Sequence, residues 1–81
     1  MELFFRNSQN ELKLVGKPKT EEEAFQMLKK YLYKLNPNYK MYYCRTYVTP
    51  EGTMIYDVGS HMEFFELQGY EENLNKREEQ K

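Results

Sequence analysis

Two segments at the start of the chain each predict a short strand. Residues 2–6 are a short aromatic run, residues 11–15 alternate between polar and hydrophobic positions well enough to be its partner, and the polar stretch between them predicts a hairpin turn. In the second segment we expect Leu12 and Leu14 to point inward and Lys13 to point outward. Whether this hairpin joins the main sheet or caps its edge is left open by the pattern.

The next segment, from Thr20 to Asn36, predicts a helix. Thr20 and Glu23 form a capping box, in which the Thr20 hydroxyl accepts a backbone amide and the Glu23 carboxylate reaches back to the amide of Thr20. The Asn36-Pro37-Asn38 segment ends the helix, since proline disfavours a helical conformation at the residue before it. The apolar face of this helix comprises Ala24, Phe25, Met27, Leu28, Tyr31, Leu32 and Leu35.

Residues 39–68 predict a three-stranded antiparallel meander that holds most of the aromatic side chains. Its first loop contains Pro50, which presets φ, and Gly52, which accepts the left-handed conformation that closes a three-residue loop. Pairing Thr49 with Thr53 fixes the register. The expected pairs are Val48–Met54, Thr46–Tyr56 and Cys44–Val58 on one face, and Tyr47–Ile55 and Arg45–Asp57 on the other.

The first of these two faces is expected to pack on the helix. The second would bury the Arg45–Asp57 pair at a desolvation cost that its attraction need not recover. In the last strand, Phe65 and Leu67 are expected to share one face. The element order ββαβββ predicts an α+β domain, an antiparallel sheet with one helix across one face. Residues 1–69 form this single small domain, and residues 70–81 are expected to be a charged, flexible tail.

Composition narrows the functional classes. The 81 residues are 40% hydrophobic and 31% charged, an ordinary balance for a folded domain, and the formal net charge of −1 argues against a duplex nucleic-acid binder. Charge is uneven, however, at +4 over residues 1–50 and −5 over residues 51–81. A single cysteine, with no signal peptide and no apolar run of the ~20 residues that span a membrane, predicts a cytoplasmic protein without membrane association.

The exposed side of the meander is the first candidate site. Tyrosine and arginine are enriched at binding hot spots, and an aromatic side chain beside a guanidinium suits a protein partner, a base or a phosphate. A solvated tyrosine face and a homodimer seam are the alternatives. The predicted partner-binding residues are Tyr43, Arg45, Tyr47, Ile55 and Asp57.

The sequence offers little for catalysis. Ser60 and His61 lie close to Asp57, but residues so near in sequence around a turn rarely converge as a triad, so we expect turn residues with a secondary binding role instead. The ligand spacing for zinc or calcium is absent, and we expect no metal, no cofactor and no enzyme. Cys44 is expected to be a buried structural thiol on the packed face.

The segment TMIYDVGSHMEFF, residues 53–65, carries a resemblance. A strand ending in Asp-Val-Gly-Ser, followed by a variable pair and Glu-Phe-Phe, resembles the C-terminal half of small uncharacterised proteins encoded by phages and prophages of Gram-positive bacteria. The resemblance covers about half of the chain. It implies an accessory protein that binds and blocks a host factor, such as a component of antiviral defence, and it assigns no functional residue.

The sequence therefore suggests two functions, a first hypothesis and an alternative. The first is a non-enzymatic accessory protein in the host cytoplasm that binds and inhibits a host protein through its exposed sheet face. The alternative is a sequestering or nucleic-acid-binding protein that holds phosphates with Arg45 and the lysines of the helix and loops. Those lysines are Lys13, Lys17, Lys19, Lys29, Lys30, Lys34 and Lys40.

Overall fold

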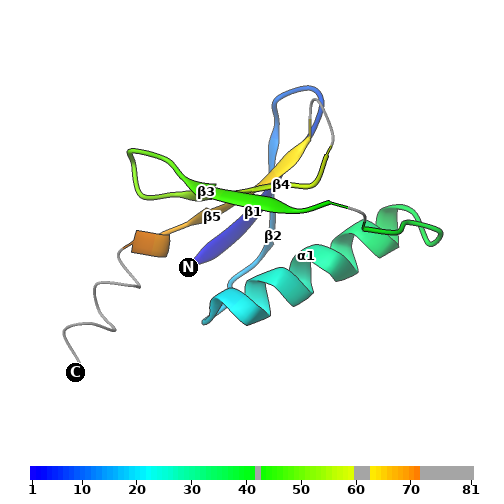
Figure 1. Cartoon of the computed structure of the whole chain (residues 1–81), viewed down its shortest axis with the longest axis horizontal. Coiled ribbons are helices and arrows are strands. Elements are labelled where there is room, and N and C mark those ends of the chain that lie inside the picture. Colours follow the sequence, from blue (N-terminus) through cyan, green and yellow to red (C-terminus); the bar gives the residue numbers. More distant parts are fainter. Residues whose placement is uncertain (42, 60–62, 72–81) are drawn as a thin grey trace.

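One antiparallel sheet and one helix make up the fold in a computed structural model of the chain (Figure 1), which describes residues 1–41, 43–59 and 63–71. The sheet has the strand order β2-β1-β5-β4-β3, and α1 lies along one side of it. The predicted α+β fold with the order ββαβββ is confirmed. The elements are β1 Glu2–Arg6, β2 Leu12–Gly16, α1 Glu21–Leu35, β3 Arg45–Val48, β4 Met54–Asp57 and β5 Phe64–Gln68.

The helix begins and ends where its sequence signals predict. The Thr20 hydroxyl accepts the Glu23 amide at 3.1 Å, which satisfies one of the amides that the first turn leaves unpaired. One detail differs from the expected capping box, because the Glu23 carboxylate accepts the amide of Lys19 at 2.9 Å instead of that of Thr20. At the other end, the Asn36 amide donates to the Leu32 carbonyl at 3.0 Å and α1 stops before Pro37.

The loop between β3 and β4 also forms as predicted. The Thr49 amide donates to the Thr53 carbonyl at 2.8 Å, the Gly52 amide donates to the Thr49 carbonyl at 2.9 Å, and Gly52 has φ of 84°. The register is therefore the expected one over β3, with Arg45 opposite Asp57 and Val48 opposite Met54. The expected pair of Cys44 with Val58 lies outside the strands, since β3 begins at Arg45.

The N-terminal hairpin joins the main sheet through β1, which pairs along its whole length with β5. Here the orientation predicted for β2 is wrong. Leu14 lies opposite Phe4 and Lys13 lies opposite the buried Phe5, so Leu12 and Leu14 point away from the helix. Leu12 is 40% exposed and Leu14 is 52% exposed. The reason is the hairpin turn, in which the Asn7 amide donates to the Glu11 carbonyl at 3.0 Å, so that the pairing continues as Arg6 with Leu12 and Phe4 with Leu14. The bulge opposite Leu3 and Phe4 comes only after Leu14.

The core lies between α1 and one face of the sheet. Three helix residues, Ala24, Leu28 and Leu32, are buried against it, and the expected inward pair Phe65 and Leu67 is fully buried. Aromatic rings form its centre: the Phe65 ring lies 5.0 Å from that of Phe5 and 5.9 Å from that of Tyr31 between centroids. The other sheet residues of this core are Leu3, Phe5, Met54 and Tyr56.

The helix does not cover β3, and this corrects a second expectation. All four residues of β3 are exposed, including Thr46 and Val48, which share a face with the buried Tyr56 and Met54 of β4. Cys44, expected as a buried thiol, is exposed as well. The side of the sheet on which these residues lie is the predicted one. The helix packs against β2, however, and β3 is the edge strand at the opposite end of the sheet.

Tyr56 gives the fold a dependence on alkaline pH. Burial, with a smaller contribution from the carboxylate of Glu21, raises the pKa of the Tyr56 phenol to about 12. The folded protein thus holds this proton more tightly than the unfolded chain, in which a tyrosine titrates near pH ~10. Stability contributed by the neutral phenol is complete below that value and is lost as the pH rises from 10 towards 12.

We therefore expect wild-type protein to lose more stability than Tyr56→Phe between pH ~9 and ~11.5, because phenylalanine has no proton to release. Urea unfolding at both pH values measures the difference. Equal losses in the two proteins would show that Tyr56 does not titrate as its burial requires.

The predicted tail is described over its first two residues. Tyr70 packs against the core, and the Glu71 amide donates to the Gly52 carbonyl at 3.2 Å, so these residues lie against the β3–β4 loop. Residues 72–81, the rest of that tail, lie outside the described part of the chain. Among the described residues, no helix has the length and apolar character needed to cross a membrane.

Candidate functional site

The candidate site is the face of the sheet opposite α1, which we call the open face. Residues directly opposite one another in antiparallel strands share a face, so the register of the strands assigns each side chain to one side. An antiparallel sheet that is covered on one side normally carries polar residues on the other. The open face instead carries an apolar side chain on every strand: Leu12 and Leu14 on β2, Phe4 on β1, Phe64 on β5, Ile55 on β4 and Tyr47 on β3.

Four of the five predicted binding residues meet on this face. Arg45 and Tyr47 lie on β3, opposite Asp57 and Ile55 of β4, and the Arg45 guanidinium carbon is 5.9 Å from the centre of the Tyr47 ring. Tyr47 is 49% exposed. Tyr43, the fifth residue, is also exposed but precedes β3 and belongs to the connection from α1.

Within this predicted set, Ile55 has a different environment from the one expected, whereas Asp57 makes a turn contact of the expected kind. Ile55 is only 5% exposed, because it lies on an interior strand between Tyr47 of β3 and Glu66 of β5. It forms the floor of the site and offers little contact area. The Asp57 carboxylate accepts the Gly59 amide at 3.0 Å, which is the turn role that its sequence position favours.

The structure adds three residues that the sequence did not identify. Arg6, Phe64 and Glu66 border a shallow groove of about 440 Å³ together with Tyr47 and Ile55. Arg6 lies far in sequence from Phe64 and Glu66, and the three meet because β1 pairs with β5, a pairing that the sequence left open. The sequence does contain a matching pattern that could have indicated this pairing. Phe4 and Arg6 flank the buried Phe5 just as Phe64 and Glu66 flank the buried Phe65.

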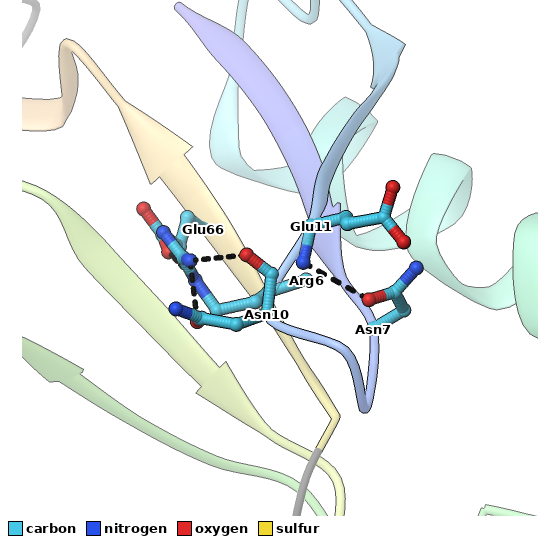
Figure 2. A network of polar contacts seen from close by, with 5 residues as sticks. All are labelled: Arg6, Asn7, Asn10, Glu11 and Glu66. Atoms are coloured by element: carbon cyan, nitrogen blue, oxygen red, sulfur yellow. Dashed lines mark hydrogen bonds and ion pairs between the residues drawn. The ribbon is translucent and has the colours of Figure 1, made fainter.

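On the open face, within the described part of the chain, the side chain of Arg6 makes several polar contacts (Figure 2). Its Nε donates to Glu66 Oε2 at 2.7 Å, and its terminal nitrogen donates to the Asn10 side-chain oxygen at 2.7 Å and to the Asn10 carbonyl at 3.2 Å. The guanidinium also lies 5.7 Å from the centre of the Phe64 ring. These contacts hold Arg6 in place and neutralise its charge, so it is suited to shape the groove more than to capture an anion.

Figure 2 also shows how the turn before β2 is held. The Asn7 side-chain oxygen accepts the Glu11 amide at 3.0 Å, which the figure draws. It also accepts the Gln9 amide at 2.9 Å, the role that asparagine commonly takes in turns. Asn10 has φ of 65°, a left-handed conformation that asparagine tolerates better than most residues. The turn therefore presents Asn10 to Arg6.

The three helix lysines expected to hold phosphates lie on the other side of the sheet from Arg45. Arg45 lies on the open face, whereas Lys29, Lys30 and Lys34 belong to α1 on the other side of the sheet. Lys29 is partly buried, with its ammonium 5.2 Å from the centre of the Phe25 ring. A single surface containing Arg45 and the helix lysines therefore does not form.

The other residues considered for catalysis or metal binding form no site in the described part of the chain. Ser60 and His61 lie outside the described residues. Within the described ranges, no group of three histidine, cysteine, aspartate or glutamate side chains lies close enough to hold a metal ion. Partial desolvation, with a further contribution from the Asp57 carboxylate, raises the pKa of the Cys44 thiol, so this exposed cysteine is less reactive than a free thiol at neutral pH.

Comparison of the chain with protein-family models, with curated proteins and with solved structures gives no match. The geometry of the open face is therefore the main indication of what this chain does.

Proposed function

We propose that the protein is a non-enzymatic binding protein that engages another protein through its open face. The observation that carries the proposal is the apolar side chain that each of the five strands places on the side of the sheet opposite α1. Three of these side chains, Leu12, Leu14 and Tyr47, are 40–52% exposed, and exposed apolar side chains gathered on one face are typical of interaction sites. The resemblance to phage and prophage proteins suggests a bacterial host protein as the partner and inhibition as the outcome.

The shape of the face supports a protein partner. Its groove is shallow and is bounded by side chains from several strands, whereas small-molecule sites are concave and enclose most of their ligand. The aromatic and aliphatic side chains supply contact area, and the charged groups Arg6 and Glu66 already neutralise each other. The complementary partner surface is therefore mainly apolar, with polar groups at its rim.

Two substitutions on the open face test this proposal against a matched control. Leu14 on β2 is 52% exposed, and Leu35 near the end of α1 is 58% exposed. We expect Leu14→Ala or Phe64→Ala to lower recovery of the partner by at least about tenfold, the effect of losing one interface hot spot, and Leu35→Ala to leave it unchanged. Affinity capture from a Gram-positive lysate, quantified by mass spectrometry for each variant, measures the recovery.

The supporting result is a protein whose recovery falls with both open-face variants and not with the control. Recovery that is insensitive to all three substitutions would contradict the proposal. Binding to oligonucleotides that weakens steeply as salt is raised would instead favour phosphate recognition.

A further inference from the structure

The two edges of the sheet differ in how well they are protected. At β2, α1 packs against the strand, Lys13 lies within it and a bulge interrupts its pairing with β1. Each of these features discourages the addition of another strand. At the other edge, β3 pairs with β4 without a bulge, contains neither lysine nor proline and is exposed at all four residues. Such an edge is a template for strand addition.

The hydrogen bonds of the hairpin show which backbone groups of β3 are available. Since the Thr49 amide bonds the Thr53 carbonyl, alternation along the antiparallel ladder directs the amides and carbonyls of Tyr47 and Arg45 towards β4. The backbone groups of Thr46 and Val48 consequently point away from β4, to the edge. A new strand would find its first partners there.

We propose that a second copy of this chain pairs with β3 in the antiparallel sense, about a two-fold axis at Thr46. Thr46 then lies opposite Thr46 of the second copy in a hydrogen-bonded pair, and the two sheets become one continuous sheet. Symmetric pairing of this kind joins identical surfaces and closes as a dimer.

This register is favoured by the side chains that it brings together. On the open face, Arg45 lies opposite Tyr47 of the second copy, and Tyr47 lies opposite the second Arg45. The cation therefore meets an aromatic ring twice, as Arg45 already does with its own Tyr47 at 5.9 Å. On the helix side, Val48 lies opposite Cys44 of the second copy, which covers a valine that is otherwise exposed.

The edge is self-complementary because none of these pairs sets like charges against each other. Two threonines directly opposite one another also favour pairing, since their hydroxyls can bond across the strands. These features point to a second copy instead of an unrelated peptide as the occupant of the edge. The dimer does not depend on the proposed function, although it would place two open faces side by side.

Cysteine substitution tests both the dimer and its register. In a Cys44→Ser background, we expect Thr46→Cys to form an intermolecular disulfide under mild oxidation, because residues of a hydrogen-bonded pair have Cα atoms ~5.5 Å apart and a disulfide requires about 4.4–6.8 Å. Val48→Cys in the same background is the control, since its two copies would be about 13 Å apart along the strands. Non-reducing electrophoresis and intact-mass measurement detect the product.

Cross-linking of Tyr47→Cys in preference to Thr46→Cys would overturn this register, since it would place the two-fold axis at Tyr47. Equal and slow cross-linking at all three positions would indicate random collision and overturn the dimer.

A second variant addresses association without cross-linking. By sedimentation equilibrium we expect the mass of the wild-type protein to double as its concentration rises. Thr46→Pro removes an amide that points to the edge, so we expect it to preserve the hairpin and to abolish that doubling. Leu14→Ala, on the far strand, should leave that doubling unchanged, which separates the dimer from the proposed partner binding. A wild-type protein that remains monomeric up to millimolar concentration would refute the proposal.

Discussion

Phe65→Ala is expected to lower the free energy of unfolding by about 3–5 kcal/mol, the range measured for truncating a buried aromatic side chain. Phe65 is fully buried, and its ring contacts those of Phe5 and Tyr31, so alanine would leave a cavity at the centre of the core. A domain this small has only a single modest core, and a loss of this size is a large part of its total stability. Urea unfolding followed by circular dichroism measures the change.

Phe64→Ala is the matched control for this prediction, because it removes the same side chain from the adjacent residue on the open face. Phe64 is partly exposed and contacts Arg6 through its ring, so we expect a loss of only about 1 kcal/mol. Similar losses for both variants would mean that the two faces of β5 are packed to a similar degree, contrary to the described core.

Glu66→Ala is expected to cost about 2–3 kcal/mol, more than a surface ion pair, because the substitution leaves the partly buried guanidinium of Arg6 without its carboxylate. The 2.7 Å bond between these side chains links β5 to β1, and β1 connects the N-terminal hairpin to the meander. Thermal or urea unfolding of Glu66→Ala compared with Glu22→Ala, an exposed carboxylate on α1, measures the specific part of the effect.

A double-mutant cycle completes that experiment. Arg6→Ala should also destabilise the protein, and the double variant should lose less stability than the two single variants together, by about 1–2 kcal/mol. Strict additivity would show that the pair contributes nothing beyond its separate side chains, as many exposed ion pairs do.

The local elements could be predicted because their signals act over a few residues. The Thr20 cap, the stop before Pro37 and the loop containing Pro50 and Gly52 each depend on backbone preferences that tertiary contacts did not override. The loop in turn fixed the register of β3 with β4, so Arg45, Tyr47 and Asp57 reached the predicted face.

The errors arose where the packing of distant elements decides the outcome. The register that turned Leu12 and Leu14 to the open face is set at the hairpin turn, and a turn that differed by one residue would have reversed the two sides of β2. Cys44 and Val48 were expected to be buried because their side is apolar, but α1 packs against β2 at the opposite edge of the sheet.

By itself, then, the sequence determined the elements, the β3–β4 hairpin and the alternation of sides, because these follow from neighbouring residues and from the two-residue period of a strand. Only the tertiary structure decided that β1 lies between β2 and β5, and this placement brings Arg6 to Glu66 and completes the apolar open face. The physical reason is that strand pairing is made through backbone groups that every sequence shares. The choice of neighbour therefore depends on how the whole core packs.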